Sequence, residues 1–137
     1  MRFHTLALAG AAALTVLASG GVAQATAAHT DENGVCEVNE ICLYWGDNLT
    51  GSLYDSYSWY PDLVGKRFVS GGPGQGSWVK NNAASVWNRL EGTHACVFYD
   101  EMYRGAVDKI EFGSANLTVT KNNNASVKWG NGGSPSC

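Results

Sequence analysis

The sequence predicts an all-β fold in which two Greek-key motifs pack together as a sandwich. One pattern occurs twice in the chain, each time with room for about four short strands. Short runs of β-branched and aromatic residues are separated by clusters of Gly, Asn, Asp and Pro, which is typical of strands joined by turns. No segment carries a long apolar pattern with the 3.6-residue period of a helix.

The internal repeat is the first of these observations. Its first half reads CLYWGDNLTG at 42–51 and CVFYDEMYRG at 96–105, and the two strings match in residue type at most positions, from the cysteine to the final glycine. Its second half reads KNNAASV at 80–86 and KNNNASV at 121–127. The stretch between the two halves is longer in the first copy, and the extra residues lie within 52–79. A repeat of this kind indicates two copies of one supersecondary unit.

The expected strands follow one another along the chain. The runs with the residue types of strands are 43–45, 85–87, 97–99, 117–120 and 125–129. The run 117–120 also alternates polar and apolar residues with a period of two. The Gly-rich stretch 71–76 is expected to be a turn-rich loop, because it lacks the flanking elements and the lysine of a phosphate-binding loop.

The segment 1–27 has the pattern of a secretory signal peptide. Arg2 supplies the positive charge, Leu6–Ala18 is an uncharged apolar stretch, and small residues at 23–28 offer cleavage sites. The apolar stretch is shorter than the roughly 20 residues that a membrane-spanning helix needs. We therefore expect cleavage after Ala27 and a secreted, extracellular protein.

The remainder of the chain, 28–137, has the length of a single domain. The two repeats divide it into segments at about 36–90 and 91–137. We expect this domain to be monomeric.

The composition excludes several classes of function. The 137 residues include 9 Lys and Arg against 12 Asp and Glu, so the chain has no basic surface for nucleic acid. Of the 3 His only His94 lies well inside the domain, which argues against a His-rich metal site or a Ser-His-Asp triad. No recognisable acid/base pair or nucleophile–base pair is present either. We expect no enzymatic activity, and neither a nucleic-acid nor a membrane partner.

The 4 cysteines are expected to form two disulfides, since an even number in a small exported chain is typical of them. The spacing between Cys36 and Cys42 is enough for a small closed loop. The second pair would then be Cys96–Cys137, which would fasten the C-terminus to the body of the domain. The sequence leaves the other two pairings open. The spacings do not form the paired knuckles of a zinc site.

Each copy of the repeat resembles the Greek-key motif of the βγ-crystallins. The motif positions in the first and second copy are Tyr44 and Phe98, Leu49 and Tyr103, Gly51 and Gly105, and Ser85 and Ser126. In a folded hairpin of this kind a glycine allows positive φ, an aromatic ring covers the bend, and a serine hydroxyl satisfies backbone groups. The resemblance implies a βγ-crystallin-like double Greek key in which these residues have structural roles.

The chain also resembles the actinomycete secreted peptidase-inhibitor family, typified by metalloproteinase inhibitors. The resemblance covers about 36–129 and rests on export, domain size and the positions of Cys36, Cys42 and Cys96. It implies a protease inhibitor that offers a rigid, substrate-like loop to an extracellular metalloprotease. The reactive bond of the family follows a disulfide-bonded cysteine, which here is Cys96–Val97. The family pattern has a second cysteine a few residues further on, which this chain lacks, and Val97 also suits a buried strand.

The alternative function is a crystallin-like binding module for calcium, a glycan or a microbial surface, including an antimicrobial role. Crystallin-like domains often bind calcium through a motif that here would use Asn81 and Asn82, and Asn122 and Asn123. A second register preserves the apolar pattern and places a lysine and an alanine where oxygen ligands are needed. The sequence therefore leaves calcium binding open. The same runs of Asn are also typical of turns, because Asn side chains bond to the local backbone. No other cofactor is expected.

The longer first copy also carries a group of aromatic residues. Tyr54, Tyr57, Trp59 and Tyr60 are the candidates for an exposed recognition patch. A small β-sandwich also buries aromatic rings in its core, so the sequence leaves both interpretations open.

Overall fold

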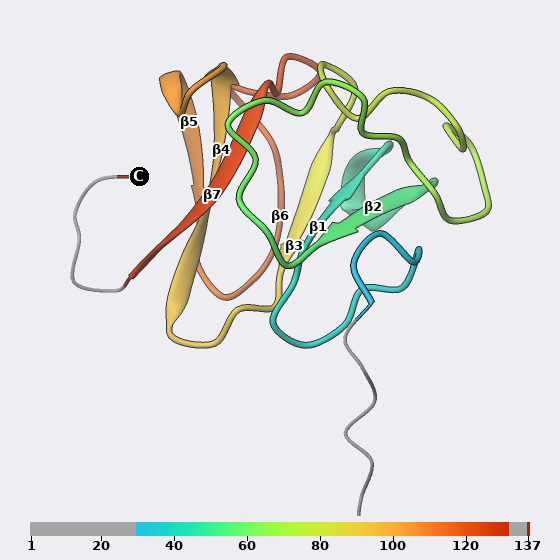
Figure 1. Cartoon of the computed structure of the whole chain (residues 1–137), viewed down its shortest axis with the longest axis horizontal. Coiled ribbons are helices and arrows are strands. Elements are labelled where there is room, and N and C mark those ends of the chain that lie inside the picture. Colours follow the sequence, from blue (N-terminus) through green and yellow to red (C-terminus); the bar gives the residue numbers. More distant parts are fainter. Residues whose placement is uncertain (1–29, 132–136) are drawn as a thin grey trace, which may run out of the picture.

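The computed structural model describes residues 30–131 and residue 137, which fold into two antiparallel sheets (Figure 1). The first sheet has the strand order β2-β1-β3-β6 and the second has the order β5-β4-β7. The elements are β1 (Ile41–Tyr44), the short 3-10 helix η1 (Asp47–Leu49), β2 (Leu53–Ser56), β3 (Ser85–Asn88), β4 (Thr93–Asp100), β5 (Arg104–Ile110), β6 (Gly113–Asn116) and β7 (Ser126–Asn131). The predicted signal peptide at 1–27 lies outside the described residues.

The two repeats exchange backbone segments. Strand β6 belongs to the second repeat, yet it pairs with β3 in the sheet of the first repeat. In return Tyr60 of the first repeat forms an isolated antiparallel bridge with Val127 of β7. Both backbone hydrogen bonds of that bridge measure 2.9 Å. These pairings join the two repeats into one double Greek-key sandwich, which confirms the predicted fold class.

The core lies between the two sheets and also contains the long insert of the first repeat. The inward-facing strand residues Leu43, Val86 and Val97 are all at most 1% exposed. The insert adds Leu63 and Phe68, which are equally buried. The extra residues of the first copy therefore fill the core, because two sheets of short strands bury too little apolar surface by themselves.

A serine ties each folded hairpin to the last strand of its own repeat. The Ser85 hydroxyl donates to Gly46 O at 2.6 Å and accepts from Leu49 N at 3.0 Å. In the second copy the Ser126 hydroxyl makes the equivalent bonds: it donates to Asp100 O at 2.7 Å and accepts from Tyr103 N at 3.1 Å. Both serines are fully buried, as expected for hydroxyls that satisfy backbone groups inside a bend.

The bend itself requires the motif glycines and their covering side chains. Gly51 and Gly105 have φ values of 76° and 79°, a region that side-chain-bearing residues rarely adopt. A Cβ at Gly51 would also lie 2.9 Å from the backbone oxygen of Pro73. In the second copy Phe98 and Tyr103 make an edge-to-face contact with ring centroids 5.9 Å apart. In the first copy Leu49 packs against a small buried cluster that includes Tyr44.

One expected strand is absent from the described part of the chain. The run 117–120 alternates like a strand, but the neighbouring residues 113–116 form β6 instead. The Asp108 carboxylate accepts hydrogen bonds from the backbone N–H and the hydroxyl of both Thr118 and Thr120. These backbone donors are therefore bound to a side chain and do not join a sheet ladder, which is why the alternation does not produce a strand.

Both disulfides are present with the favoured pairing. Cys36 and Cys42 have Cα atoms 5.8 Å apart, and Cys96 and Cys137 have Cα atoms 5.5 Å apart. The first disulfide closes a small loop before β1, whereas the second joins the central strand β4 to residue 137. Among the described residues no cysteine is free.

Candidate functional site

The structure argues against a reactive bond between Cys96 and Val97. Both residues are fully buried on β4, the central strand of the second sheet. Val97 is paired with Asp108 on one side and with Val127 on the other. A protease cleft accepts an exposed, extended segment whose backbone is free to pair with the enzyme, and this peptide bond has neither property. The β-branched and aromatic residues around Val97 belong to a core strand.

The four Asn predicted as possible calcium ligands lie in turns. The side-chain amides of Asn82 and Asn123 donate to the backbone oxygen two residues earlier, at 3.1 and 3.0 Å. Asn81 and Asn122 have positive φ values of 64° and 56°. Asn tolerates this left-handed region better than most residues, because its short side chain bonds to the local backbone.

A lysine ammonium lies beside each of these Asn turns and contacts the opposite repeat. Lys80 Nζ contacts Asp62 Oδ1 at 2.7 Å and the Glu101 carboxylate, and these hydrogen bonds raise the Lys80 pKa. Lys121 Nζ contacts Asp47 Oδ2 at 2.6 Å. Asp47 and Glu101 occupy matched positions of the repeat, as do the two lysines. A fixed positive charge therefore already neutralises the carboxylates that border each turn.

Within 30–131 and 137, no group of three clustered His, Cys, Asp or Glu ligand atoms consists of carboxylate oxygens alone. The two groups there that combine three His, Cys, Asp or Glu ligand atoms are His94 with Cys96 and Cys137, and Glu40 with Cys36 and Cys42. Each contains a disulfide, so its sulfur atoms are already bonded to one another.

A different segment has the properties of a binding loop, namely residues 33–39, which we call the 33–39 loop. It precedes β1, and the Cys36–Cys42 disulfide joins its middle to β1. Its tip carries two apolar side chains, Val35 at 57% and Val38 at 52% exposure. Exposed valines on a short, cross-linked loop have no packing role in the domain and are available to a partner.

Two buried carboxylates fix the backbone of the 33–39 loop. Asp55 on β2 is fully buried and accepts hydrogen bonds from Asn33 N at 2.9 Å and from Gly34 N at 2.7 Å. Glu40 is also fully buried and accepts from Glu37 N at 2.6 Å. Since both acceptors are held inside the protein, they place the loop backbone as firmly as a sheet ladder would.

Arg89, the residue directly after β3, holds two further backbone groups of the loop. Its guanidinium donates to Cys36 O, and its backbone oxygen accepts from Asn39 N at 3.0 Å. The centre of the Trp87 ring lies 4.8 Å from the guanidinium carbon and restricts its position. The backbone groups of the loop thus bind inward, whereas the valine side chains face solvent.

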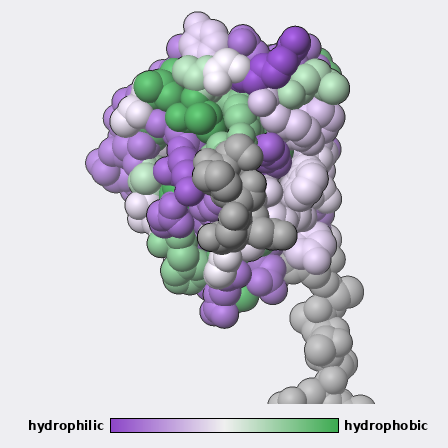
Figure 2. All heavy atoms as spheres, turned by 90° about the vertical axis from the view of Figure 1, so that its left-hand side faces the viewer, coloured by the Kyte–Doolittle hydropathy of each residue, from purple (hydrophilic) through white to green (hydrophobic). Residues whose placement is uncertain are grey.

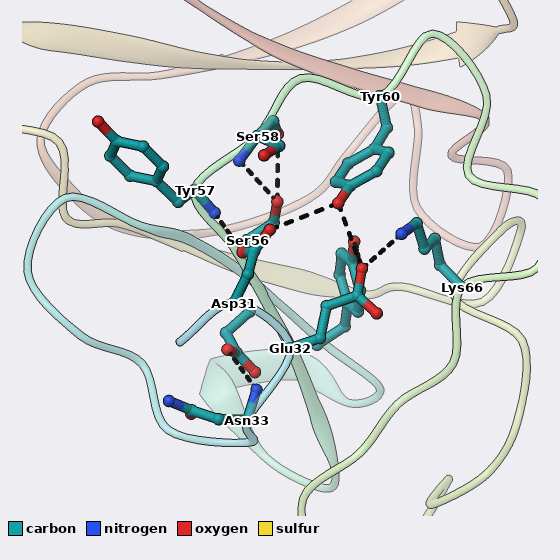
Figure 3. Close-up of polar contacts among 10 residues, drawn as sticks. Asp31, Glu32, Asn33, Ser56, Tyr57, Ser58, Tyr60 and Lys66 are labelled. Atoms are coloured by element: carbon teal, nitrogen blue, oxygen red, sulfur yellow. Dashed lines mark hydrogen bonds and ion pairs between the residues drawn. The ribbon is translucent and has the colours of Figure 1, made fainter. Parts of the chain in front are cut away.

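The residues before the loop are fastened to the insert of the first repeat, as Figure 3 shows. Asp31 accepts a hydrogen bond from Tyr57 N at 2.6 Å, and Glu32 pairs with Lys66 and accepts from the Tyr60 hydroxyl. Burial alone would raise the Glu32 pKa, but the hydrogen bond and charge of Lys66, together with the hydrogen bonds from Tyr54 and Tyr60, outweigh it and lower that pKa.

This loop is not among the sequence predictions, although the sequence contains one feature that could have pointed to it. Val35 and Val38 flank the first cysteine of a short Cys-x5-Cys loop, which is an unusual place for two apolar residues. What the sequence could not show is that Asp55, Glu40 and Arg89 converge on the same backbone.

Comparison with protein families shows which family the chain belongs to. The model of peptidase inhibitor family I36 matches residues 29–110, which include the 33–39 loop, the insert and strands β1 to β5. The chain belongs to peptidase inhibitor family I36. It is therefore a member of an inhibitor family rather than of an enzyme family, and its family implies a protease as partner. No curated protein matches the chain.

The fold of this I36 member is that of solved βγ-crystallin domains. One, from work on the evolution of the eye-lens βγ-crystallin fold, has 19% identity and a TM-score of 0.54, and the match covers 71% of this chain and 91% of that one. The N-terminal domain of protein S has 17% identity and a TM-score of 0.52, with 67% and 96% covered. At these identities the likeness shows the fold alone.

The predicted aromatic patch of this I36 member is only half exposed. Tyr54 is fully buried and Tyr60 is partly buried against the core. Tyr57 and Trp59 are 53% and 52% exposed, and both rings contact Trp129, with centroids 6.2 and 5.5 Å away. Within the described residues no helix has the length and apolar character needed to cross a membrane.

Proposed function

We propose that the chain is a secreted, monomeric inhibitor of an extracellular metalloprotease, and that it binds the enzyme through the 33–39 loop. The observation that carries this proposal is a loop whose backbone is bound to buried groups while Val35 and Val38 are exposed. Membership in an inhibitor family supports the protease as partner. Cleavage after Ala27 would leave the loop close to the new N-terminus, where an enzyme can reach it.

The fixed backbone supports tight binding in a physical sense. Ordering a flexible segment costs about 1 kcal/mol or more per residue, so a free heptapeptide loses several kcal/mol when a protease orders it. In the folded domain that cost is already met by the disulfide and by Asp55, Glu40 and Arg89. Less of the interaction energy is then lost on binding.

The exposed valines at the tip of the loop favour a target protease whose substrate pocket accepts aliphatic side chains. Zinc endopeptidases of the thermolysin type favour a bulky apolar residue after the cleaved bond, and a valine side chain meets that preference. We expect Val35 or Val38 to fill this pocket, and the loop to remain in place because Cys36 in its middle is cross-linked to Cys42 on β1.

The test uses the mature chain, residues 28–137, against a thermolysin-like zinc protease and a subtilisin-like serine protease. We expect inhibition of the zinc enzyme with an inhibition constant that rises about 30-fold or more in Val35→Asp or Val38→Asp, the loss typical of an interface anchor. Val119→Asp is the matched control, because Val119 is 50% exposed and lies outside the loop.

Two results would overturn the proposal. If micromolar protein inhibits neither enzyme class, inhibition of these proteases is wrong. If the protein inhibits, but both loop variants behave like Val119→Asp, the function stands and the assignment of the loop is wrong.

A further inference from the structure

A hollow on the described surface lies away from the 33–39 loop, between the two Asn turns and the β4–β5 hairpin. It has a volume of about 660 Å³ and is lined by residues of both repeats. A smaller hollow of about 240 Å³ adjoins it and shares Lys80 and Asn81. Together they form one open groove that runs from Val64 and Trp78 to Arg104, which we call the Trp78–Arg104 groove.

Exposed aromatic rings lie in both parts of this groove. Trp78 is 48% exposed in the smaller hollow, and Tyr99 is 44% exposed in the larger one. The Arg67 guanidinium lies 3.5 Å from the centre of the Trp78 ring and holds that ring in place. Neither ring is needed to fill the core, so Tyr99 and the face of Trp78 that Arg67 does not cover are available to stack on a ligand.

The charges of the groove are balanced. Lys80 and Arg104 face Asp100 and Glu101 in its lining, and Lys80 is already bound to the Glu101 carboxylate. An anionic or cationic ligand would meet charges of both signs and gain little from either. Figure 2 shows the face that bears β4 and β5, where hydrophobic and hydrophilic residues lie next to one another.

The remaining polar groups suit a ligand rich in hydroxyls. Asn81 and Asn123 line the larger hollow, and an amide group both donates and accepts hydrogen bonds. Carboxylates accept and a guanidinium donates, so the groove offers partners for hydroxyl groups in either role. A pyranose ring has a face of C–H groups that stacks on aromatic rings and a rim of hydroxyls that both donate and accept.

We propose that the Trp78–Arg104 groove binds a neutral oligosaccharide chain, with sugar rings stacked on Trp78 and Tyr99. The binding is non-covalent and independent of the protease-binding loop. The domain would then attach to a polysaccharide surface while the 33–39 loop stays free, which keeps the inhibitor at the place where secreted proteases act.

The experiment measures binding of the mature chain to insoluble cellulose and chitin by co-sedimentation, and to their soluble hexasaccharides by tryptophan fluorescence. We expect saturable binding to at least one of the two polysaccharides, and about tenfold weaker binding for both Trp78→Ala and Tyr99→Ala. Trp59→Ala is the matched control, because Trp59 is equally exposed but lies outside the groove. Near-ultraviolet circular dichroism checks that each variant is folded.

Three results would overturn the inference. The first is that neither polysaccharide binds the folded wild-type chain. The second is that Trp59→Ala weakens binding while the folded Tyr99→Ala does not. The third is that the groove variants change protease inhibition and leave sugar binding unaltered, which would make the groove part of the protease interface. Because inhibition and sugar binding are measured separately, failure of one does not decide the other.

Discussion

The serine that closes each hairpin provides the sharpest test of the repeat. In Ser126→Ala the hydroxyl that donates to Asp100 O and accepts from Tyr103 N is lost. Ser126 is fully buried, so water does not readily replace it. Each buried backbone group left without a partner costs about 1–3 kcal/mol.

Both hydrogen-bond partners of Ser126 belong to residues that are less buried than Ser126 itself, and this reduces the penalty. Asp100 is exposed and Tyr103 is half-buried, so each backbone group regains part of its hydrogen bonding from solvent. We therefore expect a loss of about 2 kcal/mol in the free energy of unfolding, which for a domain of this size lowers Tm by about 8 °C. Ser85→Ala should have an effect of similar size, since Ser85 makes the same pair of bonds in the first copy.

The measurement is guanidinium unfolding followed by tryptophan fluorescence, with calorimetry for Tm. Ser114→Ala is the control, because Ser114 is exposed on β6 and should change stability by less than about 0.5 kcal/mol. If Ser126→Ala loses no more than this control, the hydroxyl does not stabilise the bend and the structural reasoning about the motif is wrong.

Two further predictions concern ions and pH. Millimolar calcium should leave Tm unchanged, because Lys80 and Lys121 already neutralise the carboxylates beside the Asn turns; a rise of several degrees in a thermal-shift assay would contradict this. Burial alone would raise the Asp108 pKa, but the hydrogen bonds from Thr118 and Thr120 outweigh it and lower that pKa. The contribution of Asp108 to stability is therefore complete above the unfolded pKa of about 4 and is lost as pH falls through the lower folded pKa. Asp108→Asn should flatten that acid dependence in urea titrations across the acidic range, and an unchanged slope would show that another group controls it.

The repeat made the fold readable from sequence. Aligning its two copies matches Ser85 with Ser126 and Gly51 with Gly105, and these residues have matching hydrogen bonds and φ values in the structure. Such local motifs are encoded by neighbouring residues, because the backbone of a bend allows few residue types. The run 117–120 shows the limit, since one carboxylate from another strand outcompetes its strand pattern.

The site was much less accessible to sequence analysis. Val97 was selected for its residue type and its neighbouring cysteine, and the same features describe the centre of a buried strand. The alternative loop depends on Asp55 and Arg89, which approach it from elsewhere in the chain, and on Glu40, which directly follows it. No spacing rule predicts that convergence, because it arises only when β1, β2 and β3 lie side by side.

The repeat, the strand and turn chemistry and the spacing along the chain were thus enough to indicate the all-β class and the two Greek-key motifs, whereas the disulfide pairing was one of three that the sequence left open. Access to a partner is a different kind of property, because it depends on how distant segments pack. The Cys96–Val97 bond in the middle of β4 is inaccessible because β5 and β7 flank it and the core covers it. The loop with Val35 and Val38 is accessible because its backbone is bound inward and nothing in the described residues covers its tip.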